Sequence, residues 1–191
     1  NLRFIYALSP GLDIRYDDPA EREHLLRRCS QLIELGCHHF GLLFDDVPER
    51  PDTAELVRSG ALAAAQCRVA NPVFNWIRAR HPDARFLFCP APYCGRMAEQ
   101  GVGGSNYLSQ LGRELSPGID VFWTGPEIIS REISVAHVRE LQARLRRKPL
   151  LWDNLHANDY DGRRFFCGPY AGRPPGLPGE VSGLLANPNT E

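Results

Sequence analysis

Six short apolar runs recur along the chain at intervals of roughly 30 to 45 residues, and this spacing limits the possible folds more than any other feature. Each run ends at a cluster of Pro, Gly, Asp or Asn, and most of the intervals contain a helical pattern. Runs this short and this apolar are typical of buried parallel strands. We predict strands at residues 4–8, 40–44, 85–88, 121–123, 150–152 and 184–185.

Amphipathic patterns in the intervals predict helices over residues 19–36, 53–80, 105–115 and 134–148. In the second of these we expect a kink or a restart at Pro72, which lacks the N–H that an interior helix position donates. Ser134 is a good N-cap for the fourth. That helix ends in a basic cluster, which suits the helix dipole and solvent better than a binding patch; its members are Arg144, Arg146, Arg147 and Lys148.

Alternating strands and helices indicate an α/β protein with a parallel sheet, in one domain over residues 1–191. A doubly wound sheet would place a Gly-rich phosphate turn after an early strand, and the stretch Ser9–Leu12 is not one. Polar and aromatic residues instead follow nearly every strand, as in a TIM-type (β/α)8 barrel. Because a complete barrel has eight strands in about 250 residues, we expect roughly two βα units to be missing at the N-terminal side.

Charge and composition exclude several classes of partner. The formal net charge is −1, so we expect no nucleic acid or membrane surface as a partner. The six cysteines form no Cys-x-x-Cys pair, so we expect reduced, buried thiols. His38 and His39 lack further ligands at metal spacing, so we expect no metal. Without a signal sequence we expect a cytoplasmic or nucleocytoplasmic protein, although a missing N-terminus could hide a signal for secretion.

Two carboxylates, Asp45 and Asp46, end the apolar run at residues 40–44. Pro48 breaks the extended run, so the backbone can turn both toward one pocket. Two close carboxylates raise each other's cost of ionisation, which lets one stay protonated as a general acid while the other stays charged. The pair Asp17-Asp18 before Pro19 shows the alternative, a simple helix entry. At a strand end we favour function.

The densest polar stretch is residues 151–161, where an apolar strand opens into carboxylates, amides, an imidazole and aromatic rings. Turn capping explains two or three of these residues but not all of them. Tyr93 and Asn187 follow two other strands and are compatible with turn chemistry or with function. For Trp123 and its neighbours we favour structural packing.

Taken together, these strings resemble glycoside hydrolase family eighty-four, the O-GlcNAcase type of β-N-acetylglucosaminidase catalytic domain. The matching strings lie at residues 6–14, 42–47, 89–94, 123–126, 152–161 and 187–189, in the order of the family. The resemblance implies a retaining hydrolase that removes N-acetylglucosamine from Ser or Thr of proteins by substrate-assisted catalysis through an oxazoline, without a cofactor or metal. The sugar's own acetamido oxygen then replaces the protein nucleophile.

By this resemblance Asp45 would polarise the acetamido N–H, and Asp46 would act as general acid and then as general base. Five further positions would bind the sugar, namely Tyr93, Trp152, Asn154, Asp159 and Asn187. The family's glycine-rich strand end and its sugar-contacting lysine precede the string at Tyr6, and neither is present here.

Two other readings stay open. One is an inactive, truncated fragment that binds glycans or serves as a scaffold, which would share the sugar contacts but would not need Asp46 to titrate. The other is a glycosidase that acts on extracellular N-acetylhexosamine glycans, because the same machinery handles any 2-acetamido sugar. The substrate partner is therefore an N-acetylglucosamine-modified protein or a glycan.

Overall fold

The computed structural model describes residues 2–45, 47, 51–98, 100–161, 163 and 165–188, with the side chains of 51–54 left out. Six parallel strands form one sheet in chain order, β1-β2-β3-β4-β5-β6. Their bounds are Ile5–Leu8, His39–Leu43, Phe86–Cys89, Asp120–Trp123, Leu150–Asp153 and Gly183–Ala186. All six predicted strands are thus confirmed. The doubly wound alternative is wrong, because its strand order would reverse at a switch point.

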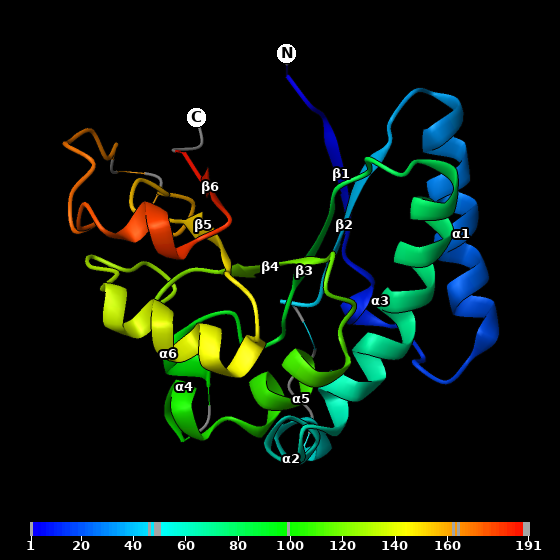
Figure 1. The fold of residues 1–191 in the computed structure, drawn as a ribbon, viewed down its shortest axis with the longest axis horizontal. Helices are drawn as coiled ribbons and strands as arrows, with labels where there is room; N and C mark the ends of the chain where they lie inside the picture. Colours follow the sequence, from blue (N-terminus) through cyan, green and yellow to red (C-terminus); the bar gives the residue numbers. More distant parts are fainter. Residues whose placement is uncertain are drawn as a thin grey trace.

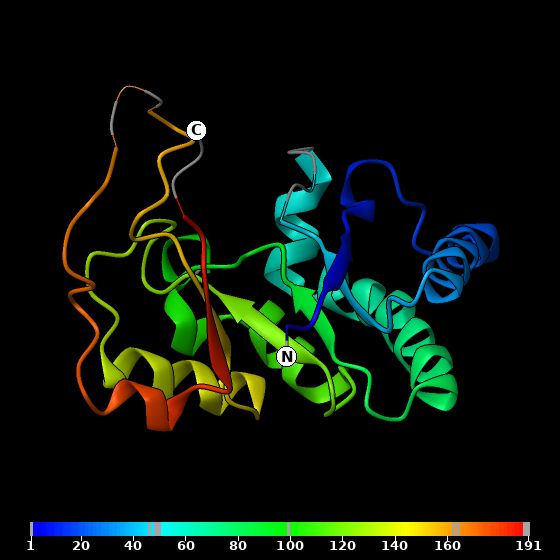
Figure 2. The same ribbon diagram turned by 90° about the horizontal axis from the view of Figure 1, so that it is seen from above.

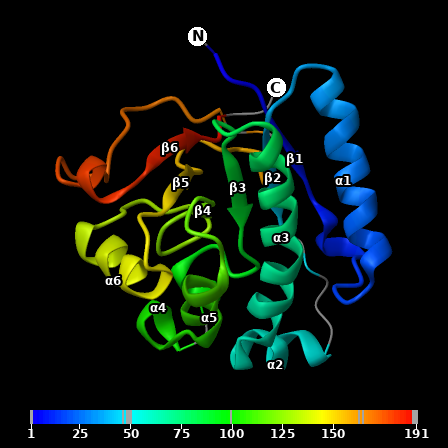
Figure 3. The same cartoon turned by 45° about the vertical axis from the view of Figure 1, so that its right-hand side comes forward.

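Helices connect the strands and lie outside the curved sheet, as Figure 1 and Figure 3 show. Contacts run from α1 to α3, from α3 to α5 and from α5 to α6. The α-helices are α1 (Pro19–Glu34), α2 (Pro51–Ser59), α3 (Ala61–Arg80), α4 (Gly101–Gly104), α5 (Asn106–Glu114) and α6 (Val135–Leu145). Three 3-10 turns, η1 (Pro10–Leu12), η2 (Gly95–Met97) and η3 (Leu177–Glu180), complete the connections. The described strands form a half-barrel of α/β type.

Side chains on successive strand residues point to opposite faces of the sheet, and this alternation separates two apolar clusters. On the outer face, Phe86 and Phe88 of β3 and Trp123 of β4 pack against the helices in the main core. On the inner face, Leu87 and Phe122 belong to a second cluster with Cys89 and Leu150, against which Trp152 packs. The inner face therefore carries apolar side chains without a helix layer over it.

The helical region restarts after Gly60, so the predicted restart at Pro72 is wrong. Gly60 has a positive φ of 80° and separates α2 from α3, a conformation that glycine adopts without steric cost. Pro72 lies inside α3, which continues to Arg80. A proline inside a helix costs about 3 kcal/mol or more through the lost hydrogen bond and the clash of its ring, and α3 offsets this because ten of its residues are buried.

The N-cap predicted at Ser134 is confirmed, and Ser105 caps α5 in the same way. The hydroxyl groups of Ser105 and Ser134 accept hydrogen bonds from the amides of Leu108 and His137. Of the basic cluster at residues 144–148, Arg147 does more than complement the dipole. It donates to the carbonyl oxygens of Leu115, Ser116 and Ile119, at 2.7 to 3.0 Å, and so ties the end of α6 to the loop before β4.

All six cysteines are free, as predicted, although Cys167 is exposed where we expected burial. Burial raises the pKa of Cys29 to about 11 and that of Cys67 to about 12. These groups are therefore neutral thiols that pack in the core rather than reactive thiolates.

The close contact between α5 and α6 depends on Gly112. A methyl group there would overlap the carbonyl oxygen of Arg144 and lie 2.9 Å from Cα of Leu145. We expect Gly112→Ala to lower the free energy of unfolding by about 1–3 kcal/mol, because overpacking outweighs the higher helix propensity of alanine. Urea denaturation measures the change. The control is Gly179→Ala, whose added Cβ has nothing within 4 Å. Unchanged or increased stability of Gly112→Ala would contradict the packing seen here.

Candidate active site

A cavity of about 620 Å³ lies at the carboxyl ends of the strands, where the loops after β2, β3, β4, β5 and β6 meet. Figure 2 shows the arrows of the sheet directed toward the side that carries the segment after β5. In a parallel sheet the carboxyl ends of all strands lie at one edge, so residues far apart in the sequence converge there. The lining residues are Asp45, Cys89, Tyr93, Arg96, Phe122, Thr124, Glu127, Ile128, Ile129, Trp152, Asn154, Ala157, Asp159, Tyr160 and Asn187.

Six of the seven site residues proposed from the sequence line this one cavity. They are Asp45 from the end of β2, Tyr93 after β3, Trp152 in β5, Asn154 and Asp159 after β5, and Asn187 after β6. The seventh, Asp46, lies outside the described residues. The structure thus brings together side chains from four strand ends that span residues 45 to 187.

Trp152 forms an apolar wall of the cavity. Its ring meets Phe122 edge to face, with the centroids 5.0 Å apart and the planes at 78°. Both rings project from the inner face of the sheet and line the cavity. An aromatic wall of this kind suits the apolar face or a methyl group of a ligand.

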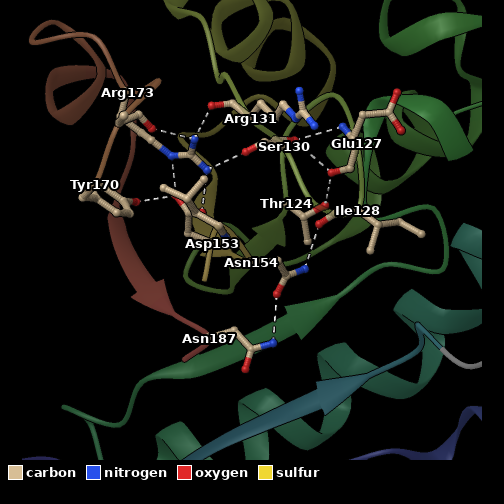
Figure 4. A network of polar contacts seen from close by, with 12 residues as sticks. Thr124, Glu127, Ile128, Ser130, Arg131, Asp153, Asn154, Tyr170, Arg173 and Asn187 are labelled. Carbon is tan, nitrogen blue, oxygen red and sulfur yellow. Dashed lines mark hydrogen bonds and ion pairs between the residues drawn. The ribbon is translucent and has the colours of Figure 1, made fainter. Parts of the chain in front are cut away.

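Asn154 is held in one orientation by hydrogen bonds on both ends of its amide (Figure 4). Its Nδ2 donates to the carbonyl oxygen of Ile128 at 2.8 Å, and its Oδ1 accepts from Nδ2 of Asn187 at 2.9 Å. The backbone N–H of Asn187 in turn donates to the carbonyl oxygen of Asp153. Each amide group has one further N–H and further lone pairs, so both can still bind a polar ligand.

Asp153, although it belongs to the polar 151–161 stretch, points away from the cavity and is not among its lining residues. Its carboxylate is buried and forms an ion pair with Arg173, with contacts of 2.6 and 2.7 Å. The hydroxyl of Tyr170 and the amide of Leu155 also donate to it. His156 lies against Tyr170 and borders a separate small cavity. Side-chain alternation explains this, because Asp153 follows the inward-facing Trp152.

Burial alone would raise the pKa of Asp153. The hydrogen bonds from Arg173, Tyr170 and Leu155 and the positive charge of Arg173 oppose this and hold the pKa below its usual value. The same environment acts on the partner phenol, since burial and the neighbouring carboxylate raise the pKa of Tyr170 to about 12. Asp153 is therefore a fixed negative charge that serves structure rather than proton transfer.

Several cavity residues were not proposed as site residues from the sequence. Thr124 follows Trp123, and its hydroxyl donates to the carbonyl oxygen of Glu127 at 2.8 Å. Arg96 and Glu127 form an exposed ion pair of 3.0 Å at the rim. Trp123 itself is fully buried and donates to His137 at 2.9 Å, which confirms its predicted packing role. No local pattern pointed to Arg96 or Glu127, because only the fold brings these loops together.

Neither a metal centre nor a bilayer-spanning segment is found in the described part of the chain. Among its residues, no group of three or more His, Cys, Asp or Glu side chains could hold a metal ion. His39 instead accepts a hydrogen bond from the amide of Arg85, and His38 stacks on His81. None of the described helices is long and apolar enough to cross a membrane.

Comparisons with known proteins agree on one family. A family model described as beta-N-acetylglucosaminidase matches residues 1–191. The Protein O-GlcNAcase of Rattus norvegicus and that of Mus musculus are each 43% identical over 190 residues. These alignments cover 100% of this chain but 20% of each relative.

A solved structure, the Thermobaculum terrenum O-GlcNAc hydrolase mutant D120N, superposes with a TM-score of 0.86 at 34% identity. The superposition covers 99% of this chain and 40% of the hydrolase chain. The chain thus spans about a fifth of the length of the curated relatives it matches.

Asp153→Asn tests the ion pair at the end of β5. Because the folded-state pKa of Asp153 is lowered, its stabilisation is present above the ordinary Asp pKa of about 3.9 and is lost as the pH falls through the folded-state value. At neutral pH we expect the substitution to lower the free energy of unfolding by about 3–5 kcal/mol, since it leaves a buried charge unpaired.

Urea denaturation at a series of pH values measures this effect, with the exposed Asp83→Asn as the control. The difference between Asp153→Asn and the unsubstituted chain should shrink as the pH falls below about 3.9. A difference that stays constant down to strongly acid pH would show that the pair does not contribute in this way.

Proposed function

Because the chain belongs to the β-N-acetylglucosaminidase family, we propose that it carries the active site of a retaining β-N-acetylglucosaminidase that removes O-linked N-acetylglucosamine from Ser or Thr of proteins. The observation that carries this proposal is the convergence of six sequence-proposed residues on one cavity. Its volume of about 620 Å³ lies in the range of small-ligand sites, roughly 300–1,000 Å³. The relatives named Protein O-GlcNAcase support the choice of substrate.

We propose a substrate-assisted mechanism in which the acetamido oxygen of the sugar attacks its own anomeric carbon. The bond from that carbon to the Ser or Thr oxygen breaks, and an oxazoline forms. Water then opens the oxazoline from the same face as the departed group, so the configuration is retained. In this scheme the protein must orient the acetamido group and move protons, and it supplies no nucleophile of its own.

Asp45 and Asp46 are assigned the two proton roles. Asp45 lines the cavity and would accept a hydrogen bond from the acetamido N–H, which makes the acetamido oxygen more nucleophilic as the ring closes. Asp46 is the next residue in the chain and would protonate the leaving oxygen, then take a proton from the attacking water. The second role needs an acid near neutral pH, and a neighbouring carboxylate raises the pKa of such a group.

The remaining residues are assigned to the sugar. Trp152, packed on Phe122, would enclose the acetamido methyl, and Tyr93 would donate a hydrogen bond beside it. Asn154, with its amide fixed on both ends, would orient the acetamido and leaving groups. Asp159 and Asn187 line the same cavity and would bind the outer hydroxyls, since carboxylate and amide oxygens accept hydrogen bonds from them.

We further propose that the half-barrel is part of an eight-stranded (β/α) barrel. Strand β1 pairs with β2 and strand β6 with β5, and apolar side chains at these edges are exposed, Phe4 by 67% and Leu184 by 42%. Two further strands would pair the edges and cover this surface. For the whole protein we propose a cytoplasmic or nucleocytoplasmic location, which the six free thiols of residues 1–191 favour.

Substitution of the proposed general acid gives the first test of function. We expect Asp46→Asn to reduce kcat about 100- to 10,000-fold on an N-acetyl-β-glucosaminide with a poor leaving group. The loss should be much smaller with a dinitrophenol leaving group, which departs without protonation. Asp83→Asn, an exposed carboxylate at the opposite end of β3, is the matched control. Binding of N-acetylglucosamine without any turnover in the unsubstituted protein would favour an inactive glycan-binding domain instead.

Fluorination of the substrate's acetyl group tests the nucleophile. Each fluorine withdraws electrons from the acetamido oxygen, so kcat should fall stepwise from acetyl to trifluoroacetyl if that oxygen attacks. The trend is measured by the rates of hydrolysis of four aryl glycosides, which carry an acetyl, fluoroacetyl, difluoroacetyl or trifluoroacetyl group. A rate that is independent of fluorination would point to a nucleophile from the protein and would contradict the substrate-assisted mechanism.

A further inference from the structure

One guanidinium group fastens the segment after β5 to the end of that strand. Arg173 makes five hydrogen bonds, one for each of its N–H donors (Figure 4). Nε and one proton of Nη2 bind both oxygens of Asp153, at 2.7 and 2.6 Å. The other three donors reach the carbonyl oxygens of Ser130, Arg131 and Ala171, at 2.8 to 3.0 Å. The side chain of Arg173 is 5% exposed.

Two of these carbonyl groups belong to the loop between β4 and α6, residues 124–134, which forms one wall of the cavity through Ile128 and Ile129. The backbone on either side of Arg173 supports this attachment. The N–H of Ile133 donates to the carbonyl oxygen of Gly172 at 2.9 Å. Gly172 has a positive φ of 74°, and a Cβ there would overlap the carbonyl oxygen of Arg131. The two segments therefore pack with their backbones in contact.

The same loop fixes the amide of Asn154, which donates to the carbonyl oxygen of Ile128 at 2.8 Å. Arg173 donates hydrogen bonds to the carbonyl oxygens of Ser130 and Arg131, which lie two and three residues after Ile128 in the same loop. Any shift of the loop would move the carbonyl group that orients Asn154 together with the wall residues Ile128 and Ile129. The position of Arg173 is thus transmitted to the cavity, although Arg173 itself does not line it.

A buried ion pair by itself contributes little net stability compared with an apolar pair. Removing two charges from water costs several kcal/mol each, and an apolar pair of similar volume is often as stable or more so. What the planar guanidinium adds is direction, because its donors fit a carboxylate and several carbonyl groups in only one arrangement. The full use of its five donors at this point in the fold argues for a role in fixing geometry.

We propose that Arg173 is a positioning residue for the sugar cavity, which holds the 124–134 loop against the end of β5 so that Asn154 and the cavity wall keep their reactive arrangement. The inference rests on the proposed function, since it assumes that Asn154 orients the acetamido group. A misplacement of about 1 Å in such a group can cost about 100-fold in rate.

The test compares Arg173→Ala and Arg173→Lys with Arg147→Ala in the protein at its natural length. Arg147 is the matched control because its guanidinium also binds backbone carbonyl groups, those of Leu115, Ser116 and Ile119, but at the amino end of β4. Thermal melts report the stability of each variant. kcat and KM for an aryl N-acetyl-β-glucosaminide, corrected for the folded fraction, report the site.

For Arg173→Ala we expect kcat/KM to fall about 10- to 100-fold, with most of the loss in kcat, because a misdirected amide harms the reacting geometry more than ground-state binding. Arg173→Lys should lie between this variant and the unsubstituted protein, since lysine retains the charge without the planar fork. Arg147→Ala should lower Tm and leave kcat/KM of the folded fraction unchanged. Millimolar guanidinium ion should restore part of kcat in Arg173→Ala.

Unchanged kcat and KM in both Arg173 variants, with a lowered Tm, would overturn the inference and reduce Arg173 to a structural role like that of Arg147. A failure of the proposed function looks different. It would appear before any substitution, as an unsubstituted protein that does not hydrolyse the glycoside, whether or not it binds N-acetylglucosamine in calorimetric titration.

Discussion

The alternation of side chains along buried parallel strands is the constraint on which the rest of the molecule depends. Each strand must present side chains that pack against the helices on one face and side chains that fit the interior of the curved sheet on the other. In β4 this places Trp123 in the core beneath the helices and Phe122 on the inner face. In β5 the same rule sends Trp152 toward the cavity and its successor Asp153 away from it. A shift of register by one residue would exchange these roles and remove the aromatic wall.

Parallel pairing then sets where chemistry can occur. Because all six strands run in one direction, the loops that follow them meet at one edge, and polar residues separated by more than one hundred positions become neighbours. Asp45 and Asn187 line the same cavity for this reason. The loops are not held by the sheet alone. The Arg173–Ser130 and Asn154–Ile128 hydrogen bonds connect the segment after β5 to the loop after β4.

Much of this arrangement could be read from the sequence where the signal is local. The six apolar runs, the capping residue Ser134 and the polar strand ends depend on neighbours within a few positions, and each was predicted. Predictions were wrong where two local signals competed. Pro72 has the stronger intrinsic tendency to break a helix, yet the chain breaks at Gly60, because the burial of α3 outweighs one missing hydrogen bond.

The sequence by itself determined the order of the strands and the family, and it supplied the residues that we propose to bind a sugar, because these follow from periodicity and from strings of adjacent residues. Only the tertiary structure decided that Asp153 is a structural anion paired with Arg173, twenty positions away. It likewise decided that Arg96 and Glu127 meet at the cavity rim. The physical reason is that such contacts depend on how the loops fold back over the sheet edge. The partner of a buried charge is distant in the sequence, so the neighbouring residues do not identify it.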